Sequence, residues 1–136
     1  MTNESLARSY LRKASDRLDV LDVLLNKRAY SDVVREAQEL VELALKGMLR
    51  AIGIEPPKLH DVGALLLEHH ERFTIEVRAQ LADLADISRR LRKERELAFY
   101  GDIDFIPTEE YSAEDARKAR QEAQRVLEAA MCAIRM

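Results

Sequence analysis

The chain has few of the residues that interrupt helices. Its 136 residues include four glycines, three prolines and one cysteine, and there is no tryptophan. Between the glycines and prolines, apolar residues recur at steps of three and four, which is the period of an amphipathic helix, and no alternating β-strand pattern competes. The lone Cys132 excludes an internal disulfide and suits a small buried apolar group in a reduced protein. The scarcity of turn residues predicts an all-α fold.

Long apolar runs and a large excess of one charge are also absent. No run approaches the roughly 18 residues that a membrane-spanning helix needs, and the N-terminal residues lack the basic and apolar regions of a secretion signal. We therefore expect a cytoplasmic protein that does not enter a membrane. Charged residues make up 35% of the chain, but 22 basic side chains nearly balance 25 acidic ones. Any binding to nucleic acid must then come from a local patch.

The apolar pattern divides the chain into four long helices and one short helix. The first long helix is expected from about residue 3 to 27, and the second from Ser31, a good N-cap, to a stop at Gly53. The second has the broadest apolar sector, so we place it at the centre. Residues 1–136 are expected to form a single domain, an antiparallel four-helix bundle with an additional short helix.

The second half of the chain contains the short helix and two of the long ones. Asp61 is expected to cap the short helix, after an extended link set by two adjacent prolines. The third long helix is expected from Thr74 through about residue 98, and a loop follows at 101–108. Ser112 then starts the fourth long helix, with an acidic residue three positions on, as in a weaker form of the capping box.

Cationic side chains are concentrated between residues 88 and 102. Five of them precede an aromatic pair and a Gly-Asp stop: Arg89, Arg90, Arg92, Lys93 and Arg95. By helical spacing, one flank carries Ser88, Arg92, Arg95 and Phe99. Guanidinium groups offer planar bidentate donors to phosphate oxygens, and aromatic rings offer a face to a base. The segment has the groups needed to hold a nucleotide or RNA, although its interleaved glutamates also fit a solvated, salt-bridged helix face.

The two aromatic residues of this segment have different expected roles. Phe99 is expected to close the end of the bundle, since a large ring there buries much apolar surface. Tyr100, next to Gly101 and Asp102, is the better candidate for a binding site.

The histidines do not suggest a metal site. A di-iron centre in a four-helix bundle needs a Glu followed three residues later by His on each of two helices, and no such pair occurs. His69 and His70 are adjacent, so they point to different sides of a helix. His60 is most simply a loop residue beside the cap of the short helix. We expect no metal and no cofactor.

Two segments together resemble a known family. Residues 30–49, followed by Gly53, Pro56 and the run 60–62 (His-Asp-Val), resemble the first half of an HEPN domain, and residues 92–102 resemble its functional end. The resemblance covers nearly the whole chain. It implies a helical bundle that commonly dimerises. Many HEPN domains are metal-independent ribonucleases, often encoded beside a minimal nucleotidyltransferase as a toxin and antitoxin pair.

The ribonuclease motif of that family is incomplete in this chain. The motif resembles Arg, four to six residues, then His, with a Tyr two residues beyond. With five residues between them, Arg92 is followed by Ala98, and Tyr100 stands at the position of the Tyr; with four residues between them, Arg95 is followed by Tyr100 itself. Histidine suits proton transfer because its pKa lies near neutrality. A tyrosine, with an ordinary pKa near 10, is a poor base at neutral pH but can donate a proton.

The resemblance implies a homodimer that binds RNA or a nucleotide phosphate and works with a minimal nucleotidyltransferase. The implied phosphate or nucleotide ligands are Ser88, Arg92, Arg95, Tyr100 and Asp102. Glu42, on the helix that faces them, is expected to orient one of the arginines. If the protein is an enzyme, Arg92 and Arg95 stabilise the phosphorane charge and Tyr100 transfers protons.

Two alternatives stay open. In the first, the chain is an active metal-independent endoribonuclease toxin. In the second, it is a non-catalytic helical scaffold whose cationic patch contacts an acidic partner.

Overall fold

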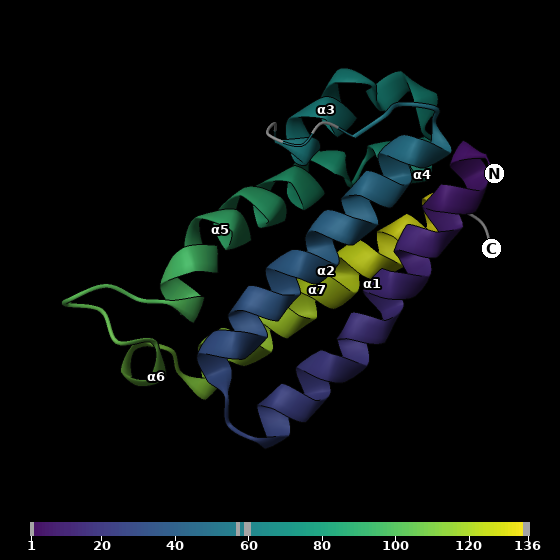
Figure 1. The fold of residues 1–136 in the computed structure, drawn as a ribbon. Coiled ribbons are helices and arrows are strands. Elements are labelled where there is room, and N and C mark those ends of the chain that lie inside the picture. Colours follow the sequence, from purple (N-terminus) through teal and green to yellow (C-terminus); the bar gives the residue numbers. More distant parts are fainter. Residues whose placement is uncertain (1, 57, 59–60, 135–136) are drawn as a thin grey trace.

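Four long helices run alternately up and down in the computed structural model, which describes residues 2–56, 58 and 61–134 (Figure 1). They are α1 (Asn3–Asn26), α2 (Tyr30–Ala51), α5 (Leu81–Phe99) and α7 (Ala113–Ile134). The described residues also form four short helical elements: α3 (Val62–Glu68), the 3₁₀ turn η1 (His70–Arg72), α4 (Ile75–Arg78) and α6 (Pro107–Glu110). The predicted all-α antiparallel bundle is confirmed. Pro57 and His60 lie outside the described residues.

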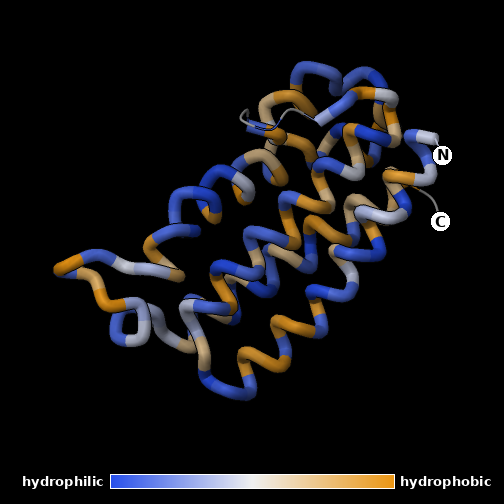
Figure 2. The backbone as a smooth tube through the Cα atoms, in the orientation of Figure 1, coloured by the Kyte–Doolittle hydropathy of each residue, from blue (hydrophilic) through white to orange (hydrophobic). Residues whose placement is uncertain are grey.

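Helix α2 is the centre of the core, as its broad apolar sector predicts. It packs against α1, α7 and α5, and its side chains Leu40, Ala44, Leu45 and Met48 have no exposed surface. Burial of such side chains is the main favourable term in folding, about 1.5–3 kcal/mol for each large one. Figure 2 shows hydrophobic residues recurring along each of the long helices. Helix α5 rests mainly on α2 and has few contacts with α7.

An arginine of α7 fixes α1 to α7. The guanidinium of Arg120 donates two hydrogen bonds to Asp22, with Nε 2.5 Å from Oδ1 and the second nitrogen 3.2 Å from Oδ2. These hydrogen bonds lower the pKa of the Asp22 carboxyl against the opposing effect of burial. A paired, two-pronged contact of this kind keeps the two helices in register.

Most of the predicted helix starts are correct. The Asp61 carboxylate accepts a hydrogen bond from the Gly63 backbone N–H at 3.0 Å, and Thr74 Oγ1 accepts one from Val77 at 3.4 Å. Ser112 and Asp115 bond to each other's backbone N–H groups at 3.1 and 2.9 Å, which is the predicted capping box.

The predicted N-cap at Ser31 is wrong. The cap position of α2 is Ala29, no side chain caps this end, and Ser31 is buried inside the first turn. Arg28 has a positive φ of 60°, so the chain turns sharply there and the helix begins earlier than the sequence suggests.

The predicted third long helix is two helices. Helix α4 ends at Arg78 and α5 begins at Leu81, because the Gln80 N–H bonds to the carbonyl of Val77, three residues back, instead of continuing the four-residue ladder. Val77, Leu81 and Leu84 are all buried, so the apolar spacing continues through a bend that the pattern does not reveal.

The predicted loop and the predicted burial of the cysteine also need correction. The loop at 101–108 contains a bridge between Asp102 and Phe105, and α6 begins inside it at Pro107, a residue well suited to the first helical position. Cys132 is exposed, because it lies about 200° around α7 from the buried Ala130.

A glycine allows α3 to lie directly on α5. A Cβ atom added to Gly63 would lie 2.7 Å from the Cα and 2.8 Å from the Cβ of Ala85. These are backbone and first side-chain atoms, which cannot move aside without moving α5. The close contact positions α3 across the end of the bundle where α5 starts.

We predict that Gly63→Ala destabilises the protein. The added methyl group gains about 1 kcal/mol of helix propensity, but forcing it against Ala85 costs about 1–3 kcal/mol or more, so the clash prevails. Urea unfolding measures the change in the free energy of unfolding. Ala64→Ser, at the neighbouring exposed position, is the control and should change it little; equal effects of the two substitutions would contradict the close packing.

Candidate functional site

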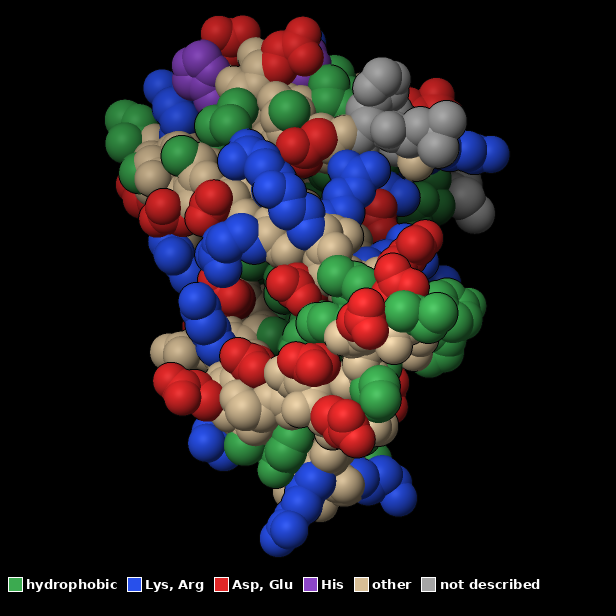
Figure 3. All heavy atoms as spheres, turned by 90° about the vertical axis from the view of Figure 1, so that its left-hand side faces the viewer, with side chains coloured by type: hydrophobic (Ala, Val, Ile, Leu, Met, Phe, Trp, Pro, Cys, Tyr) green, Lys and Arg blue, Asp and Glu red, His purple; other side chains and the backbone are tan. Residues whose placement is uncertain are grey.

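The predicted arginines lie on the C-terminal half of α5, and α5 is on the side of the molecule that Figure 3 turns toward the viewer. Arg92 is exposed and forms no ion pair within the described part of the chain. Figure 3 shows basic and acidic side chains interspersed over this face, so the surface is not uniformly positive. Any attraction for phosphate here is confined to a few side chains, as the balanced composition indicates.

Arg95 is held beside α2 by a carboxylate. A guanidinium nitrogen of Arg95 lies 2.8 Å from Glu39 Oε1, yet this buried oxygen accepts no aligned hydrogen bond. Arg95 and Glu39 therefore form an ion pair without a well-aligned hydrogen bond. The Arg95 side chain is still 44% exposed, so part of the guanidinium remains accessible from solvent.

Glu42 does not take the orienting position that the sequence suggested. Its carboxylate lies 3.6 Å from the Lys46 ammonium and accepts a hydrogen bond from Gln38 at 3.4 Å. Glu39, one turn earlier on the same flank of α2, meets the arginine instead. The spacing of residues 35, 39 and 42 shows that they share a flank, but only the register between α2 and α5 decides which one meets Arg95.

The two aromatic residues form a small stack at the end of α5. The Phe99 and Tyr100 rings meet edge to face with centroids 4.7 Å apart, and the Arg35 guanidinium lies 4.2 Å from the Phe99 centroid. Phe99 is 45% exposed, so it does not close the bundle as predicted; its ring lies over the Arg35 guanidinium instead. Tyr100 is 78% exposed, which leaves its ring and hydroxyl free for a ligand.

Two predicted ligands are placed unfavourably for binding phosphate. Ser88 is buried, because it belongs to the stripe with Leu84 and Leu91 that faces the core. Asp102 is exposed, but its carboxylate accepts a hydrogen bond from the Ile103 N–H at 2.7 Å and would repel a phosphate. Its role in the structure is to shape the turn after α5.

A tyrosine that the sequence did not single out ties the following segment to α5. The Tyr111 hydroxyl donates a hydrogen bond to Glu94 Oε2, and its ring meets Phe105 edge to face at 5.7 Å. Burial, and then the bond to Glu94, raises the pKa of Tyr111 above its ordinary range. The alternating charges of residues 92–96 did not predict the hydrogen bond to Glu94, because its donor is a tyrosine 17 residues further along the chain.

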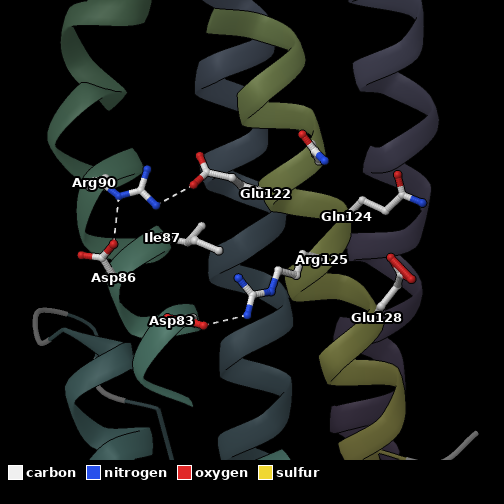
Figure 4. A pocket seen from close by; sticks show the side chains of 9 residues that line it. Asp83, Asp86, Ile87, Arg90, Glu122, Gln124, Arg125 and Glu128 are labelled. Carbon is white, nitrogen blue, oxygen red and sulfur yellow. Dashed lines mark hydrogen bonds and ion pairs between the residues drawn. The ribbon is translucent and has the colours of Figure 1, made fainter. Parts of the chain in front are cut away.

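Ion pairs cross the space between α5 and α7 (Figure 4). The Nη2 atom of Arg90 lies 2.5 Å from Glu122 Oε2, and the Nη2 atom of Arg125 lies 2.8 Å from Asp83 Oδ2. Within α5, Arg90 Nε also lies 3.1 Å from Asp86 Oδ2. The hydrogen bond to Glu122 raises the pKa of Arg90, although burial opposes the shift. Carboxylates already neutralise both arginines. The ion pairs therefore link α5 to α7, and the groove that these side chains line is a poor site for phosphate.

Within the described ranges, no group of three or more His, Cys, Asp or Glu side chains is arranged to hold a metal ion. His69 is the C-cap of α3 and His70 begins η1. In Figure 1, α3 lies at the opposite end of the bundle from α6. The described helices also include none that is both long and apolar enough to cross a membrane.

The all-α bundle agrees with one protein family. The family model described as the HEPN domain matches residues 7–133. The chain belongs to the HEPN family. HEPN domains are generally related to RNA or bind nucleotides. None of the curated proteins compared with this HEPN chain matches it.

We predict that Tyr111→Phe lowers the free energy of unfolding by about 1 kcal/mol at neutral pH, because Glu94 loses its donor. The pKa of Tyr111 is higher in the folded chain than in the unfolded one. The contribution of the hydroxyl is therefore complete below the unfolded pKa of about 10 and is lost as pH rises toward the folded pKa.

Urea unfolding at several pH values measures this difference. The difference in the free energy of unfolding between the parent and Tyr111→Phe should become smaller above about pH 10. Tyr100→Phe is the matched control, since that hydroxyl is exposed, and should leave stability unchanged at neutral pH. A gap that stays constant up to high pH would contradict the role assigned to the hydroxyl.

Proposed function

We propose that this HEPN chain binds RNA, or the phosphate of a nucleotide, through Arg92 and Arg95 with Tyr100 beside them, and that it does so as a homodimer. The observation that carries the proposal is an exposed guanidinium at Arg92 without an ion pair among the described residues. A free arginine offers a planar pair of donors that matches phosphate oxygens. Arg95 is one turn away on the same flank, so the two can meet neighbouring phosphates.

The aromatic side chains support binding of a nucleotide or a single strand. The exposed Tyr100 ring offers a face to a base, and stacking of this kind is tolerant of sequence. The Phe99 ring meets the Tyr100 ring edge to face, and the Arg35 guanidinium in turn lies over Phe99. The ring therefore needs little further ordering when a base stacks on it, which reduces the cost of binding.

Binding without cleavage is the version that the residues favour. The positions where the family motif has histidine hold Ala98 or Tyr100, and Ala98 is buried. An alanine transfers no proton, and a tyrosine is a weak base at neutral pH. Stabilisation of a phosphorane by two arginines without a proton acceptor supplies only part of the catalysis that RNA cleavage needs.

We predict that Arg92→Ala and Arg95→Ala together weaken binding of a labelled single-stranded RNA by at least about tenfold and make binding less dependent on salt. Fluorescence anisotropy in EDTA, repeated at several salt concentrations, measures both effects. A gel of the same samples shows whether the RNA stays intact.

Arg12→Ala is the control for this experiment, because Arg12 is an exposed arginine on α1, away from α5. It should bind RNA like the parent. Equal affinities of the double variant and the control would contradict the site. Cleavage of RNA by the parent but not by the double variant would replace the binding role with the ribonuclease alternative.

We further propose a minimal nucleotidyltransferase as the partner, on the basis of the family resemblance. In such pairs the tyrosine of the motif can receive a nucleotide. Tyr100 is the most exposed of the four tyrosines, so its hydroxyl is the one an enzyme reaches most easily. The partner's active site would then meet the end of α5.

We predict that incubation with ATP and a minimal nucleotidyltransferase transfers one adenylyl group to the Tyr100 oxygen of the parent chain, with release of pyrophosphate, and none to Tyr100→Phe. Intact-protein mass spectrometry measures the addition. Tyr30→Phe, at a half-buried tyrosine, is the control and should still be modified. An unchanged mass of the parent, or modification of Tyr100→Phe, would refute Tyr100 as the acceptor.

A further inference from the structure

The segment between α5 and α6 projects from the bundle and carries apolar side chains into solvent. We define the projecting loop as residues 100–106; it extends away from the helices in Figure 1, and its tip is hydrophobic in Figure 2. Ile103 at the tip is 91% exposed, and Tyr100 and Ile106 are also exposed. Apolar side chains gathered on one exposed loop are typical of an interaction surface.

The projecting loop has a fixed shape. Asp102 and Phe105 exchange two backbone hydrogen bonds of 2.9 Å each. Gly101 has a φ of +71°, and a Cβ there would lie 2.4 Å from the Phe105 carbonyl oxygen. The Phe105 ring meets the Tyr111 ring edge to face. Because the loop is already ordered, little conformational entropy is lost when its tip docks on a partner.

The projecting loop and the short helix after it are acidic. From residue 100 to residue 110 the chain has no lysine or arginine, and it carries Asp102, Asp104, Glu109 and Glu110. All four carboxylates are exposed, and within the described part of the chain none of them forms an ion pair. The tip of the loop therefore presents an apolar side chain surrounded by negative charge.

This charge disfavours RNA as the molecule that covers the loop. Carboxylates repel phosphates, so a strand held by Arg92 and Arg95 gains no attraction by extending over residues 102–110. The apolar tip and the phosphate site are therefore surfaces for different molecules.

The same charge disfavours the grooves of a second copy of the chain. The groove beside the base of the loop is lined by Glu94, Glu110, Asp115 and Glu122, which outnumber its three basic side chains. The groove between α5 and α7 also has more carboxylates than arginines. An acidic tip would be repelled by either groove, so the surface that fits it belongs to a different protein, one with an apolar pocket and a basic rim.

The position of Tyr100 indicates which protein this is. Tyr100 begins the projecting loop, so an enzyme that acts on its hydroxyl must also contact the loop. An enzyme that transfers a nucleotidyl group from ATP has to offset the charge of the triphosphate with arginine, lysine or Mg²⁺. The surface around its nucleotide therefore attracts carboxylates.

We propose that the projecting loop is the docking surface for the nucleotidyltransferase, with Ile103 in an apolar pocket beside the active site of the enzyme and Asp104 against basic side chains at the rim. This inference rests on the partner of the proposed function and names the surface that the partner recognises. Because the loop has a fixed shape, docking at Ile103 brings Tyr100 to one place on the enzyme, next to the bound ATP.

We predict that Ile103→Ser and Asp104→Lys each raise the KM of the chain, as the substrate of adenylyl transfer, at least about tenfold and leave kcat nearly unchanged. Docking contacts are the same before and during the reaction, so their loss weakens binding without slowing the chemical step. In that step the Tyr100 oxygen bonds to the α-phosphorus of ATP, the bond to the β-phosphate oxygen breaks, pyrophosphate leaves and the hydroxyl proton passes to water. Initial rates from intact-protein mass spectrometry, at saturating ATP and varied concentrations of the chain, measure both constants.

The matched controls are Ile75→Ser and Glu76→Lys, the same kinds of change at another adjacent pair of apolar and acidic residues. Both residues are exposed on α4, near the other end of the bundle in Figure 1. The control variants should keep the KM and kcat of the parent. All four positions are exposed, so circular dichroism should show an unchanged helix content in every variant.

The outcomes separate the docking surface from the partner itself. A parent that the enzyme does not modify overturns both. A modified parent whose loop variants keep its KM, or lose only kcat, overturns the docking surface and leaves the partner standing. Sedimentation velocity and the RNA anisotropy assay test the other occupants: if Ile103→Ser dissociates a dimer or releases RNA while its KM is unchanged, the loop contacts a second copy or RNA and the proposal is wrong.

Discussion

Burial of the apolar sector of α2 is the constraint on which the other features depend. Leu40, Leu45 and Met48 lose all contact with water only because α1, α7 and α5 cover α2 from three sides. The hydrophobic effect is roughly proportional to the area removed from water, so covering this sector outweighs the small preferences of individual surface residues. Once α5 is committed to α2, the part of α5 that neither α2 nor α3 covers remains at the surface.

The charges on α5 follow from that packing. Arg95, next to the contact with α2, meets Glu39, whereas Arg92 remains exposed. On the side toward α7 the helices touch little, and ion pairs such as Arg90 with Glu122 cross the gap. The same helix therefore presents a compensated cation, Arg90, toward α7 and an available one, Arg92, on the flank proposed to bind phosphate. Charge count alone does not distinguish the two, because the difference is only whether a carboxylate from another helix lies within reach.

Helix periodicity gave the bundle and most of its caps, because these depend on residues three or four positions apart. Asp61 and Ser112 are recognisable as caps for this reason. The errors arise where the decisive contact is distant or subtle. The bend between α4 and α5 keeps the apolar spacing intact, and the start of α2 depends on the unusual backbone of Arg28. Tyr111 meets Glu94 across 17 residues, a separation that no short-range pattern contains.

By itself, the sequence determined the all-α class, the central position of α2 and the segment that carries the cationic cluster, since each follows from local composition and from the period of a helix. Tertiary structure decided that Glu39, not Glu42, meets Arg95, that Ser88 is buried, and that Ile103 stands free at the tip of a fixed loop. These outcomes depend on the register of one helix against another. Register is set by the packing of the whole core, and shifting it by one turn would exchange which side chains meet while leaving every local pattern unchanged.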